Sequence, residues 1–371
     1  MGADDLPTLA RSDRPLAEAY DVALLDLDGV VYVGRDAVRH ACSALRGARK
    51  FGMRLTFVTN NAARPPAAVA SHLIELGVDA SAGEVVTSAQ AAVHYLADRL
   101  PARARVLVVG TVGLTDALLE RDLVPVFSAE DDPVAVVQGY SPDLTWSQLA
   151  EGAVAIERGV LWVATNADPT VPSPRGPLPG NGSLVAALRH ATGATPVVTG
   201  KPEPTMHRES VQRSGARHPL VVGDRLDTDI EGANAAGCAS LLVFTGVTSP
   251  RDLMLAEAKH RPSYIGADLR ALLVGHAGPD TVGGVTRCGA WSVRETDAGH
   301  FSLSSNPAPP SPSAIETTDD LDAVRAVCCA VWAYADAVLA RGRSIRLDGS
   351  EAITVAGADA EAAARLATAG I

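Results

Sequence analysis

Reactive side chains gather in four short segments of the chain, each directly after an apolar run. In sequence order they are Asp26 and Asp28, then Thr59, Asn60 and Asn61, then Lys201, and last Asp224 and Asp229. Burying carboxylates costs several kcal/mol each unless something compensates. Carboxylates, a lysine and neutral donors are together the groups that bind a divalent cation and a phosphate.

The spacing of Asp26 and Asp28 places both carboxylates in one site, because alternate residues of an extended segment face the same side. Two such carboxylates repel unless a divalent cation lies between carboxylates or the two groups have different tasks. Asp224 would supply a third hard oxygen ligand. This set suits Mg²⁺, which keeps several waters and binds few protein oxygens together with a phosphate.

The remaining polar residues suit a phosphate group. Lys201 can neutralise a phosphate oxygen or the charge of an aspartate nucleophile, and the Thr59 hydroxyl can donate a hydrogen bond. Asn60 and Asn61 can donate backbone N–H groups at the start of a helix, where anions bind. Each cluster alone has a structural explanation, as a turn, a helix cap or a solvated loop. Four clusters in this order at strand ends favour a shared function.

Apolar runs alternate with helical patterns in the parts of the chain that hold these clusters. The expected strands lie at 22–28, 54–61, 195–204, 218–230 and 239–247. Such alternation predicts an α/β fold with a doubly wound parallel sheet. Ligands bind at the carboxyl ends of the strands in these sheets, so neighbouring strands would bring the clusters into one crevice.

Three regions are expected along the chain. Residues 1–80 and 181–275 form the Rossmann-like core, and residues 81–180 form an inserted α/β domain that ends in a loop rich in Pro and Gly. Residues 285–371 form a small C-terminal α+β domain. In that domain GAWSVRETDAGHFSLSS predicts a hairpin around Asp-Ala-Gly, and residues 317–340 predict an amphipathic helix.

The composition is typical of a globular protein with a substantial core, since 47% of the 371 residues are hydrophobic and 20% are charged. A net charge of −11 argues against broad binding to nucleic acid or to an anionic membrane. Five scattered cysteines without a C-x-x-C pair indicate reduced thiols. We recognise neither a signal peptide nor an apolar run of membrane-spanning length, and therefore expect a cytoplasmic protein.

The motifs DLDGVVYVG, TFVTNN, TGKPEP and VVGDRLDTDIEGA resemble the four motifs of the haloacid dehalogenase-like superfamily of phosphohydrolases. The insert between the second and third motifs is similar to the C2-type cap of the group that includes phosphoglycolate, pyridoxal-phosphate and 4-nitrophenyl phosphatases. The resemblance covers about residues 20–275. It implies an Mg²⁺-dependent phosphomonoester hydrolase that works through an aspartyl-phosphate.

The resemblance also implies a role for each cluster. Asp26 would be the nucleophile, and Asp28 the general acid and then the general base. The metal site would comprise Asp26, Asp28 and Asp224, with Asp229 in support directly or through water. Thr59 and Lys201 would hold the phosphoryl group, and Asn60 and Asn61 are further candidate phosphate-binding residues through their backbone N–H groups. A dehalogenase needs no acid for its leaving halide, so Asp28 favours a phosphatase.

Substrate choice is expected to lie in the cap. Asn166 and Asp168 are candidate cap residues near the substrate, although a structural turn explains them equally well. Relatives usually have Gly-aromatic-Asp where this chain has Gly139-Tyr140-Ser141, which leaves open any contact made by that Asp. A cap followed by a small α+β domain resembles the actinobacterial glycerol-3-phosphate phosphatases, whose appendage is likened to an acetyltransferase fold. We therefore expect glycerol 3-phosphate as the substrate.

Other interpretations stay open. A phosphatase for phosphoglycolate, an aryl phosphate or a nucleotide would use the same core residues. A metabolite-sensing or partner-binding protein would work through the C-terminal domain, but the complete set of acid, nucleophile and lysine argues against it. We find no acetyl-CoA pyrophosphate loop after position 280 and expect no acetyl transfer. The expected partner is a small-molecule phosphomonoester, and the sequence leaves a homo-oligomer open.

Overall fold

The computed structural model describes residues 9–171, 175–305, 320–341 and 353–371. The chain divides into two compact units, Met1–Leu55 with Arg217–Ile371 and Thr56–Ala216. We call them the first unit and the second unit. The boundaries of core, cap and appendage that the sequence suggests (1–80 with 181–275, 81–180 and 285–371) remain a prediction.

The first unit contains four parallel strands in the order β15-β14-β13-β1. They are β1 (Val22–Leu25), β13 (Pro219–Gly223), β14 (Ala239–Val243) and β15 (Tyr264–Gly266). All residues of β1 are buried, which is why this strand is apolar throughout and does not alternate. Leu25 pairs with Val222, so the residues after β1 and β13 emerge at the same edge of the sheet.

Short helices and turns connect these strands. They are α1 (Leu16–Ala19), α2 (Ala41–Lys50), α9 (Glu231–Ala236), α10 (Pro250–Met254), 3-10 turns at Ala258–His260 and Leu269–Leu273, and a π turn at Leu226–Ile230. A small hairpin of β2 (Tyr32–Val33) and β3 (Asp36–Ala37) follows β1. In α2 the buried residues Ala41, Ala44, Leu45 and Ala48 recur at helical spacing, which places one apolar face of the helix against the core.

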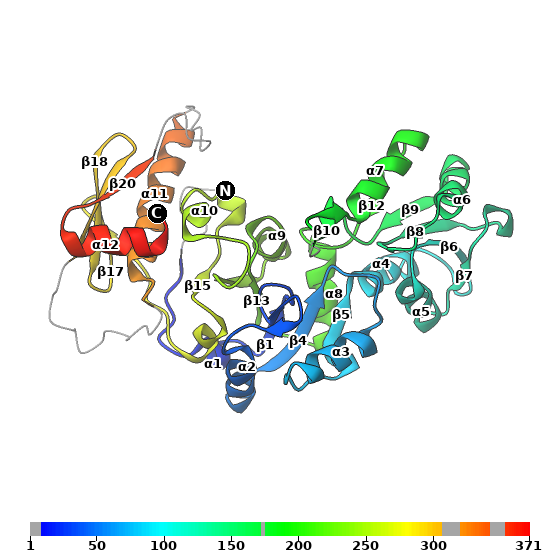
Figure 1. The fold of residues 1–371 in the computed structure, drawn as a ribbon, viewed down its shortest axis with the longest axis horizontal. Helices are drawn as coiled ribbons and strands as arrows, with labels where there is room; N and C mark the ends of the chain where they lie inside the picture. The colour runs from blue at the N-terminus through cyan, green and yellow to red at the C-terminus, as the bar shows by residue number, and fades with distance from the viewer. Residues whose placement is uncertain (1–8, 172–174, 306–319, 342–352) are drawn as a thin grey trace. The chain divides into compact units, whose positions relative to one another are not determined.

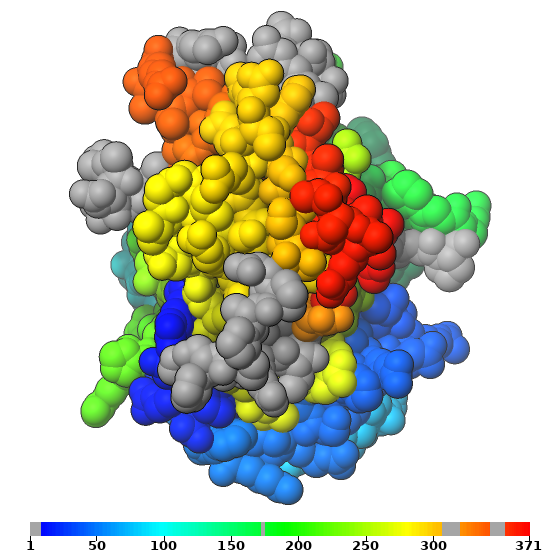
Figure 2. Space-filling model, turned by 90° about the vertical axis from the view of Figure 1, so that its left-hand side faces the viewer, coloured from blue at the N-terminus to red at the C-terminus, as the bar shows by residue number. Residues whose placement is uncertain are grey.

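A five-stranded sheet in the order β16-β17-β18-β19-β20 forms the C-terminal part of the first unit. Its strands are β16 (Asp280–Val282), β17 (Val285–Cys288), β18 (Trp291–Asp297), β19 (His300–Ser305) and β20 (Thr354–Gly357). β18 and β19 form the predicted antiparallel hairpin, and β20 joins β19 in parallel. α12 (Ala360–Ala369) packs on β19 and β20, and Figure 2 shows it beside the strands.

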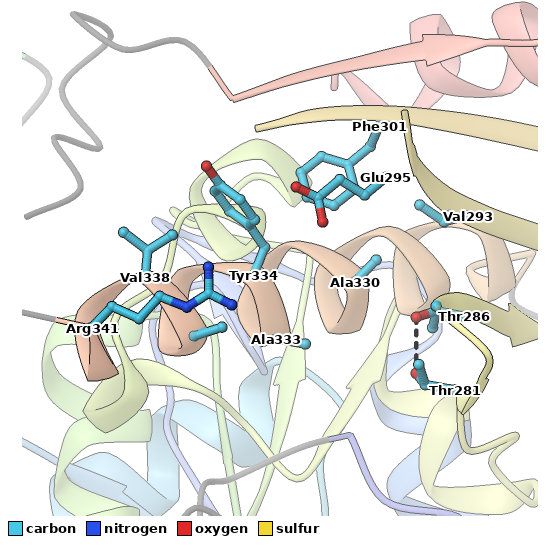
Figure 3. A pocket seen from close by; sticks show the side chains of 12 residues that line it. Thr281, Thr286, Val293, Glu295, Phe301, Ala330, Ala333, Tyr334, Val338 and Arg341 are labelled. Atoms are coloured by element: carbon cyan, nitrogen blue, oxygen red, sulfur yellow. Dashed lines mark hydrogen bonds between the residues drawn. The ribbon is translucent and has the colours of Figure 1, made fainter. Parts of the chain in front are cut away.

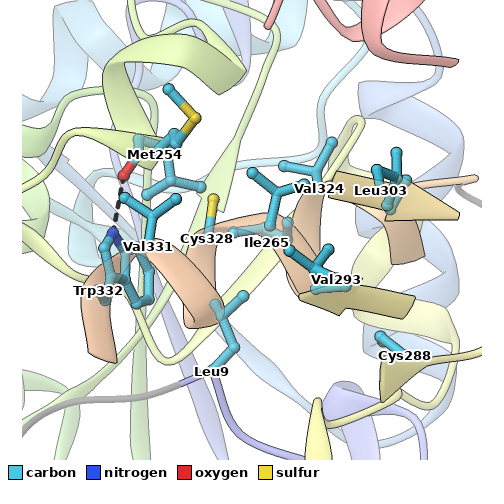
Figure 4. Close-up of a cluster of buried hydrophobic side chains, with 14 of the residues drawn as sticks. Leu9, Met254, Ile265, Cys288, Val293, Leu303, Val324, Cys328, Val331 and Trp332 are labelled. Atoms are coloured by element: carbon cyan, nitrogen blue, oxygen red, sulfur yellow. Dashed lines mark hydrogen bonds between the residues drawn. The ribbon is translucent and has the colours of Figure 1, made fainter. Parts of the chain in front are cut away.

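One hydrophobic core joins this C-terminal part to the rest of the first unit (Figure 4). Its members include Leu9, Met254, Ile265, Val293, Leu303, Val324, Val331 and Trp332. α11 (Asp322–Ala340) lies in the middle of this core, and the Nε1 of Trp332 donates a hydrogen bond to the carbonyl oxygen of Leu253 at 3.1 Å. The C-terminal part therefore shares its core with the sheet that carries Asp26.

α11 corrects the expectation that no apolar run reaches membrane-spanning length. The helix has 19 residues and is apolar enough, by length and composition, to cross a membrane. Most of it is buried, and it packs against β17, β18 and α10. The buried Arg325 on this helix donates to the carbonyl oxygen of Ile265 at 2.9 Å and to Asp322 Oδ1 at 3.0 Å. α11 is thus the core helix of the C-terminal part.

The second unit begins within β4 (Arg54–Thr59), which pairs in parallel with β5 (Val85–Thr87). A second sheet has five parallel strands in the order β12-β9-β8-β6-β7. They are β6 (Arg105–Val109), β7 (Val124–Val126), β8 (Ala135–Gln138), β9 (Leu161–Ala164) and β12 (Val197–Val198). Smaller elements are 3-10 turns at Ala82–Glu84 and Ala129–Asp131 and a hairpin of β10 (Thr170–Val171) with β11 (Leu178–Pro179).

Helices cover both faces of this second sheet (Figure 1). They are α4 (Ser88–Ala97), α5 (Val112–Glu120), α6 (Trp146–Glu157) and α7 (Asn181–Thr192), while α3 (Pro66–Glu75) and α8 (Pro204–Ser214) complete the unit. Val106 and Val108 of β6 pack into one core with α4 and α5, whereas Leu107 packs into the other with α6 and α7. This alternation along a buried strand gives each face its own core.

The strand before Lys201 departs from expectation. The sequence suggests that the run at 195–204 extends the same sheet as the runs at 22–28 and 218–230. Instead β12 pairs with β9 of the second sheet, with Val197 opposite Val163. Only two residues of the run are paired, so its apolar pattern is too short to specify which sheet it joins.

Candidate active site

Three carboxylates meet in the first unit. Asp26, Asp224 and Asp229 each offer an oxygen, and these oxygens lie within 4.8 Å of one another. Asp26 follows β1 and Asp224 follows the neighbouring strand β13, so the parallel pairing places both at one edge. Asp229 lies in the π turn after Asp224, and both are buried, each at 1% exposure. The pairing of two strands therefore brings together residues that are far apart in the sequence.

Backbone N–H groups donate hydrogen bonds to the buried carboxylates of Asp224 and Asp229, and a glycine packs closely against Asp224. The Val247 N–H donates to Asp224 Oδ2 at 2.7 Å, and the Arg225 N–H donates to Asp229 Oδ2 at 3.2 Å. A Cβ atom at Gly29 would lie 2.5 Å from Asp224 Oδ2, so glycine is needed there for close approach. Gly29 also has a φ of +82°, which glycine adopts without strain.

This donor set fits a divalent metal ion. Three carboxylate oxygens at this separation repel one another, and a cation among them offsets the repulsion. The group contains neither His nor Cys, and its hard oxygens suit Mg²⁺ or Ca²⁺ better than a softer transition metal. Asp26, Asp224 and Asp229 could therefore hold such an ion.

Asp28 lies outside the group of three carboxylates. Its side chain is exposed, and the chain turns directly after it, with the Gly29 N–H donating to the carbonyl oxygen of Tyr32 at 2.8 Å. An exposed carboxylate can exchange a proton with a bound molecule or with water. The buried Asp224 and Asp229 are less suited to that task.

In the second unit, Asn60 and Lys201 are held together. The Lys201 N–H donates to Asn60 Oδ1 at 2.9 Å, and Asn60 Nδ2 donates to the carbonyl oxygen of Lys201 at 3.1 Å. Lys201 is only 4% exposed, so it is not a solvated loop residue. Its ammonium group is thus a buried positive charge in the loop between β12 and α8, suited to an anionic ligand.

Asn166 and Asp168 belong to the same cluster. Asn60 Nδ2 donates to Asp168 Oδ2 at 3.2 Å, and Asn166 Nδ2 donates to the same oxygen at 2.9 Å. Asn166 Nδ2 also donates to the carbonyl oxygen of Asn60 at 3.0 Å. The two residues predicted to lie near the substrate are therefore bonded to a residue predicted to bind phosphate.

Thr59 and Asn61 lie in a loop and not at the start of a helix. α3 begins at Pro66 with Pro65 as its N-cap, which corrects both the helix-start expectation and the N-cap alternative. The Asn61 N–H donates to Thr59 Oγ1 at 3.1 Å. This bond leaves the Thr59 hydroxyl proton able to point toward a ligand.

His207 on α8 is a residue of this neighbourhood that the sequence did not indicate. It is 1% exposed, and neither ring nitrogen has a hydrogen-bond partner among the described residues. Burial, and then the positive charge of Lys201, lower the pKa of His207 to about 3. The ring is therefore neutral at physiological pH. The sequence around a single histidine in a predicted helix does not show that its ring is buried near a lysine.

The C-terminal part holds a cavity of about 270 Å³ between α11 and the sheet (Figure 3). Its walls combine apolar side chains such as Phe301 with the polar groups of Glu295, Tyr334 and Arg341. None of the residues lining it was predicted as a site residue, because the helical pattern of 317–340 indicates only which face packs inward. We assign no reaction to this cavity.

Two family models match the chain. The haloacid dehalogenase-like hydrolase model covers residues 23–124, and the HAD-hydrolase-like model covers residues 198–272. All four predicted core motifs fall within these two ranges.

Curated relatives extend the match. The D-glycerol 3-phosphate phosphatase of Mycobacterium tuberculosis is 49% identical over 320 residues, which are 86% of this chain and 88% of that protein. The 5'-nucleotidase YutF of Bacillus subtilis is 36% identical over 233 residues, which are 62% of this chain and 90% of that protein.

Solved structures agree with the predicted fold. Glycerol phosphate phosphatase from Mycobacterium tuberculosis in complex with magnesium has a TM-score of 0.82 and 44% identity, covering 96% of this chain and 98% of that one. The 4-nitrophenylphosphatase from Thermotoga maritima has a TM-score of 0.65 and 30% identity, covering 70% and 98%. These matches confirm the α/β fold class and the resemblance drawn from the motifs. This chain belongs to the haloacid dehalogenase-like hydrolase family.

Proposed function

We propose that this protein is an Mg²⁺-dependent phosphatase that hydrolyses glycerol 3-phosphate to glycerol and inorganic phosphate. The observation that carries the proposal is the group of Asp26, Asp224 and Asp229, whose oxygens lie within 4.8 Å of one another. Such a group suits a divalent cation at which a phosphate ester can bind. The similar phosphatase from Mycobacterium tuberculosis has been solved with magnesium.

The extent of the similarity supports glycerol 3-phosphate over other phosphomonoesters. The glycerol phosphate phosphatase structure covers 96% of this chain, which includes most of the C-terminal part. The 5'-nucleotidase and the 4-nitrophenylphosphatase cover only 62% and 70% of it. Phosphoglycolate, aryl phosphates and nucleotides are the alternatives that the experiment below tests.

Two carboxylates divide the chemistry in this proposal. A carboxylate oxygen of Asp26 attacks phosphorus and forms an aspartyl-phosphate, while Asp28 donates a proton to the leaving glycerol oxygen. Asp28, now ionised, takes a proton from a water molecule that attacks the same phosphorus. Inorganic phosphate leaves and the Asp26 carboxylate is restored. The exposure of Asp28 supports its role in proton transfer.

The phosphoryl group carries negative charge that other residues neutralise. Lys201 offers its buried ammonium group, and Thr59 its hydroxyl, to the phosphoryl oxygens. The loop of Asn60 and Asn61 positions these donors. Asp26, Asp28 and Asp224 form the proposed metal site, with Asp229 in support. When bound there, Mg²⁺ would offset the charge of the phosphoryl group.

We also propose a cytoplasmic enzyme that binds neither nucleic acid nor membrane. The net charge of −11 supports this, because it opposes attraction to polyanionic surfaces. Membership of a hydrolase family favours an enzyme over the sensing alternative.

The test is release of phosphate from a panel of phosphomonoesters, with and without Mg²⁺. We expect the largest kcat/KM for glycerol 3-phosphate and no turnover after treatment with a chelator. Asp26→Asn should abolish turnover without changing the far-UV circular dichroism. A higher kcat/KM for phosphoglycolate, an aryl phosphate or a nucleotide would overturn the substrate assignment. Turnover by Asp26→Asn would overturn the mechanism.

A further inference from the structure

The side chain of Asn60 pairs with both backbone groups of Lys201. Asn60 Oδ1 accepts from the Lys201 N–H, and Asn60 Nδ2 donates to the Lys201 carbonyl oxygen. The lysine backbone is thereby held on both sides by one planar amide. The orientation of that amide decides whether this pairing exists, because its two ends have opposite hydrogen-bonding character.

Asp168 is the group that orients this amide. Its Oδ2 accepts from Asn60 Nδ2 at 3.2 Å and from Asn166 Nδ2 at 2.9 Å. A carboxylate is only an acceptor, so it faces the NH₂ end of Asn60 and would repel the carbonyl end. With the NH₂ end fixed toward Asp168, Asn60 Oδ1 is left in place to accept from Lys201.

The hydrogens of both amides are fully used. Asn60 Nδ2 donates to Asp168 and Lys201, and Asn166 Nδ2 donates to Asp168 and to the carbonyl oxygen of Asn60. Each NH₂ group has two hydrogens, so neither can donate to a substrate without breaking this network. Donation of a hydrogen bond to the substrate is therefore a poorer explanation of Asn166 than support of Asn60.

The network is also anchored from outside. Asn181 Nδ2 donates to the carbonyl oxygen of Asn166 at 2.9 Å, and Ser88 Oγ donates to the carbonyl oxygen of Asn60 at 2.6 Å. Asn166 and Asn181 are 7% and 1% exposed. These two bonds restrain the segments that carry Asn60 and Asn166, so a change at Asp168 has few ways to relax.

We propose that Asp168 is a positioning residue for Lys201, acting through the Asn60 amide. This inference rests on the proposed role of Lys201 in binding the phosphoryl group. Removing the carboxylate lets the Asn60 amide turn, and the Lys201 backbone then loses both of its partners on that side chain. The ammonium group would be held less well against phosphate.

The first experiment measures the affinity of the Mg²⁺-loaded protein for inorganic phosphate by calorimetry, independently of turnover. We expect about tenfold weaker binding for Asp168→Asn and a greater loss for Asp168→Ala, because Asn keeps one acceptor oxygen. Asp132→Asn is the matched control. It makes the same change of charge at an exposed residue of the same unit and should leave the affinity unchanged.

The second experiment is a double-mutant cycle with Lys201→Met. If Asp168 acts through Lys201, Asp168→Asn should have no further effect on phosphate affinity in the Lys201→Met background. If that background does not fold, Asn60→Ala replaces it with the same expectation. Equal losses in both backgrounds would overturn the inference. So would a lower melting temperature with unchanged phosphate affinity, because that result shows a purely structural role.

These outcomes are separable from a failure of the proposed function. A wild-type protein that binds phosphate but does not hydrolyse glycerol 3-phosphate would refute the substrate and leave the positioning role to be judged by the cycle. Normal hydrolysis by the wild type, combined with an additive cycle, would refute only the positioning role.

Discussion

Gly246 passes so close to Asp224 that a Cβ atom on the glycine would lie 1.9 Å from Asp224 Oδ2. The next residue, Val247, donates its N–H to the same oxygen at 2.7 Å. The loop after β14 therefore shapes the carboxylate group as directly as the strands that carry the carboxylates. Because Asp224 is buried, its carboxylate cannot move away from a larger residue at position 246.

Gly246→Ala should displace the Asp224 carboxylate and weaken the metal site. We expect the Mg²⁺ concentration for half-maximal phosphatase activity to rise about tenfold or more. The measurement is kcat/KM for glycerol 3-phosphate across a Mg²⁺ titration. Gly83→Ala is the control, because a Cβ at Gly83 meets nothing within 4 Å. An unchanged Mg²⁺ dependence in Gly246→Ala would show that Asp224 does not hold the ion.

Asp28→Asn should separate substrates by their leaving groups. With glycerol 3-phosphate, whose alkoxide leaves poorly, we expect kcat to fall by roughly 10²–10⁴-fold, as for loss of a general acid. With 4-nitrophenyl phosphate the first step needs little protonation, so a burst of 4-nitrophenol should survive. Stopped-flow absorbance measures that burst. If Asp28→Asn lost this burst as well as glycerol 3-phosphate turnover, the first step would need Asp28 for more than protonation of the leaving group. That result would contradict the proposed acid role.

Trp332→Ala should destabilise the first unit. The indole is 2% exposed and lies in the core that the C-terminal part shares with α10, β14 and β15. Its N–H donates a hydrogen bond to the Leu253 carbonyl oxygen. We expect a loss of about 3–5 kcal/mol in the free energy of unfolding, measured with urea. Trp146→Ala is the control, since Trp146 is 82% exposed and should change stability by less than about 0.5 kcal/mol. Equal effects would show that this core contributes little.

His207 should make the fold sensitive to acid. Burial, then the charge of Lys201, lower the pKa of His207 from its ordinary value of 6.5 to about 3. Between these values the unfolded chain binds a proton that the folded protein excludes. Above pH 6.5, His207 therefore has no effect on the free energy of unfolding. Below that pH it lowers the free energy of unfolding by about 1 kcal/mol for each pH unit.

Urea unfolding of the wild type and His207→Leu from pH 7 to pH 4.5 measures this effect. The stability of the wild type should fall more steeply with acid than that of His207→Leu. His190→Leu, which removes an exposed histidine on α7, should keep the wild-type slope. Parallel slopes for the wild type and His207→Leu would show that the ring is protonated in the folded state.

Local patterns predicted much of this protein. The apolar run before Asp26 becomes the wholly buried β1, and the pattern of 317–340 becomes α11, because burial of a strand or helix face leaves a direct trace in composition. The Asp-Ala-Gly turn between β18 and β19 is equally local. The four motifs were recognisable for the same reason, since each is a few consecutive residues.

Pairings between distant segments could not be predicted in this way. The run before Lys201 joins β9 and not the sheet of β1, and a strand of two paired residues carries no information about its neighbour. Asn61 lies five residues before α3, whose start is set by Pro65 and Pro66. The burial of His207 could not be predicted either, because it results from the packing of α8 against the rest of the unit.

The sequence by itself determined which functional groups are available. They are two aspartates placed to face one side of a strand end, a lysine, a threonine hydroxyl, and further carboxylates after a second strand. Only the tertiary structure decided how these groups are held. It placed Asp224 against the backbone of Gly246, buried Lys201 beside Asn60, and used Asp168 to orient that amide. The reason is physical: residue type limits what chemistry a side chain can perform, whereas hydrogen-bond partners and burial arise from contacts between segments that are remote in the chain.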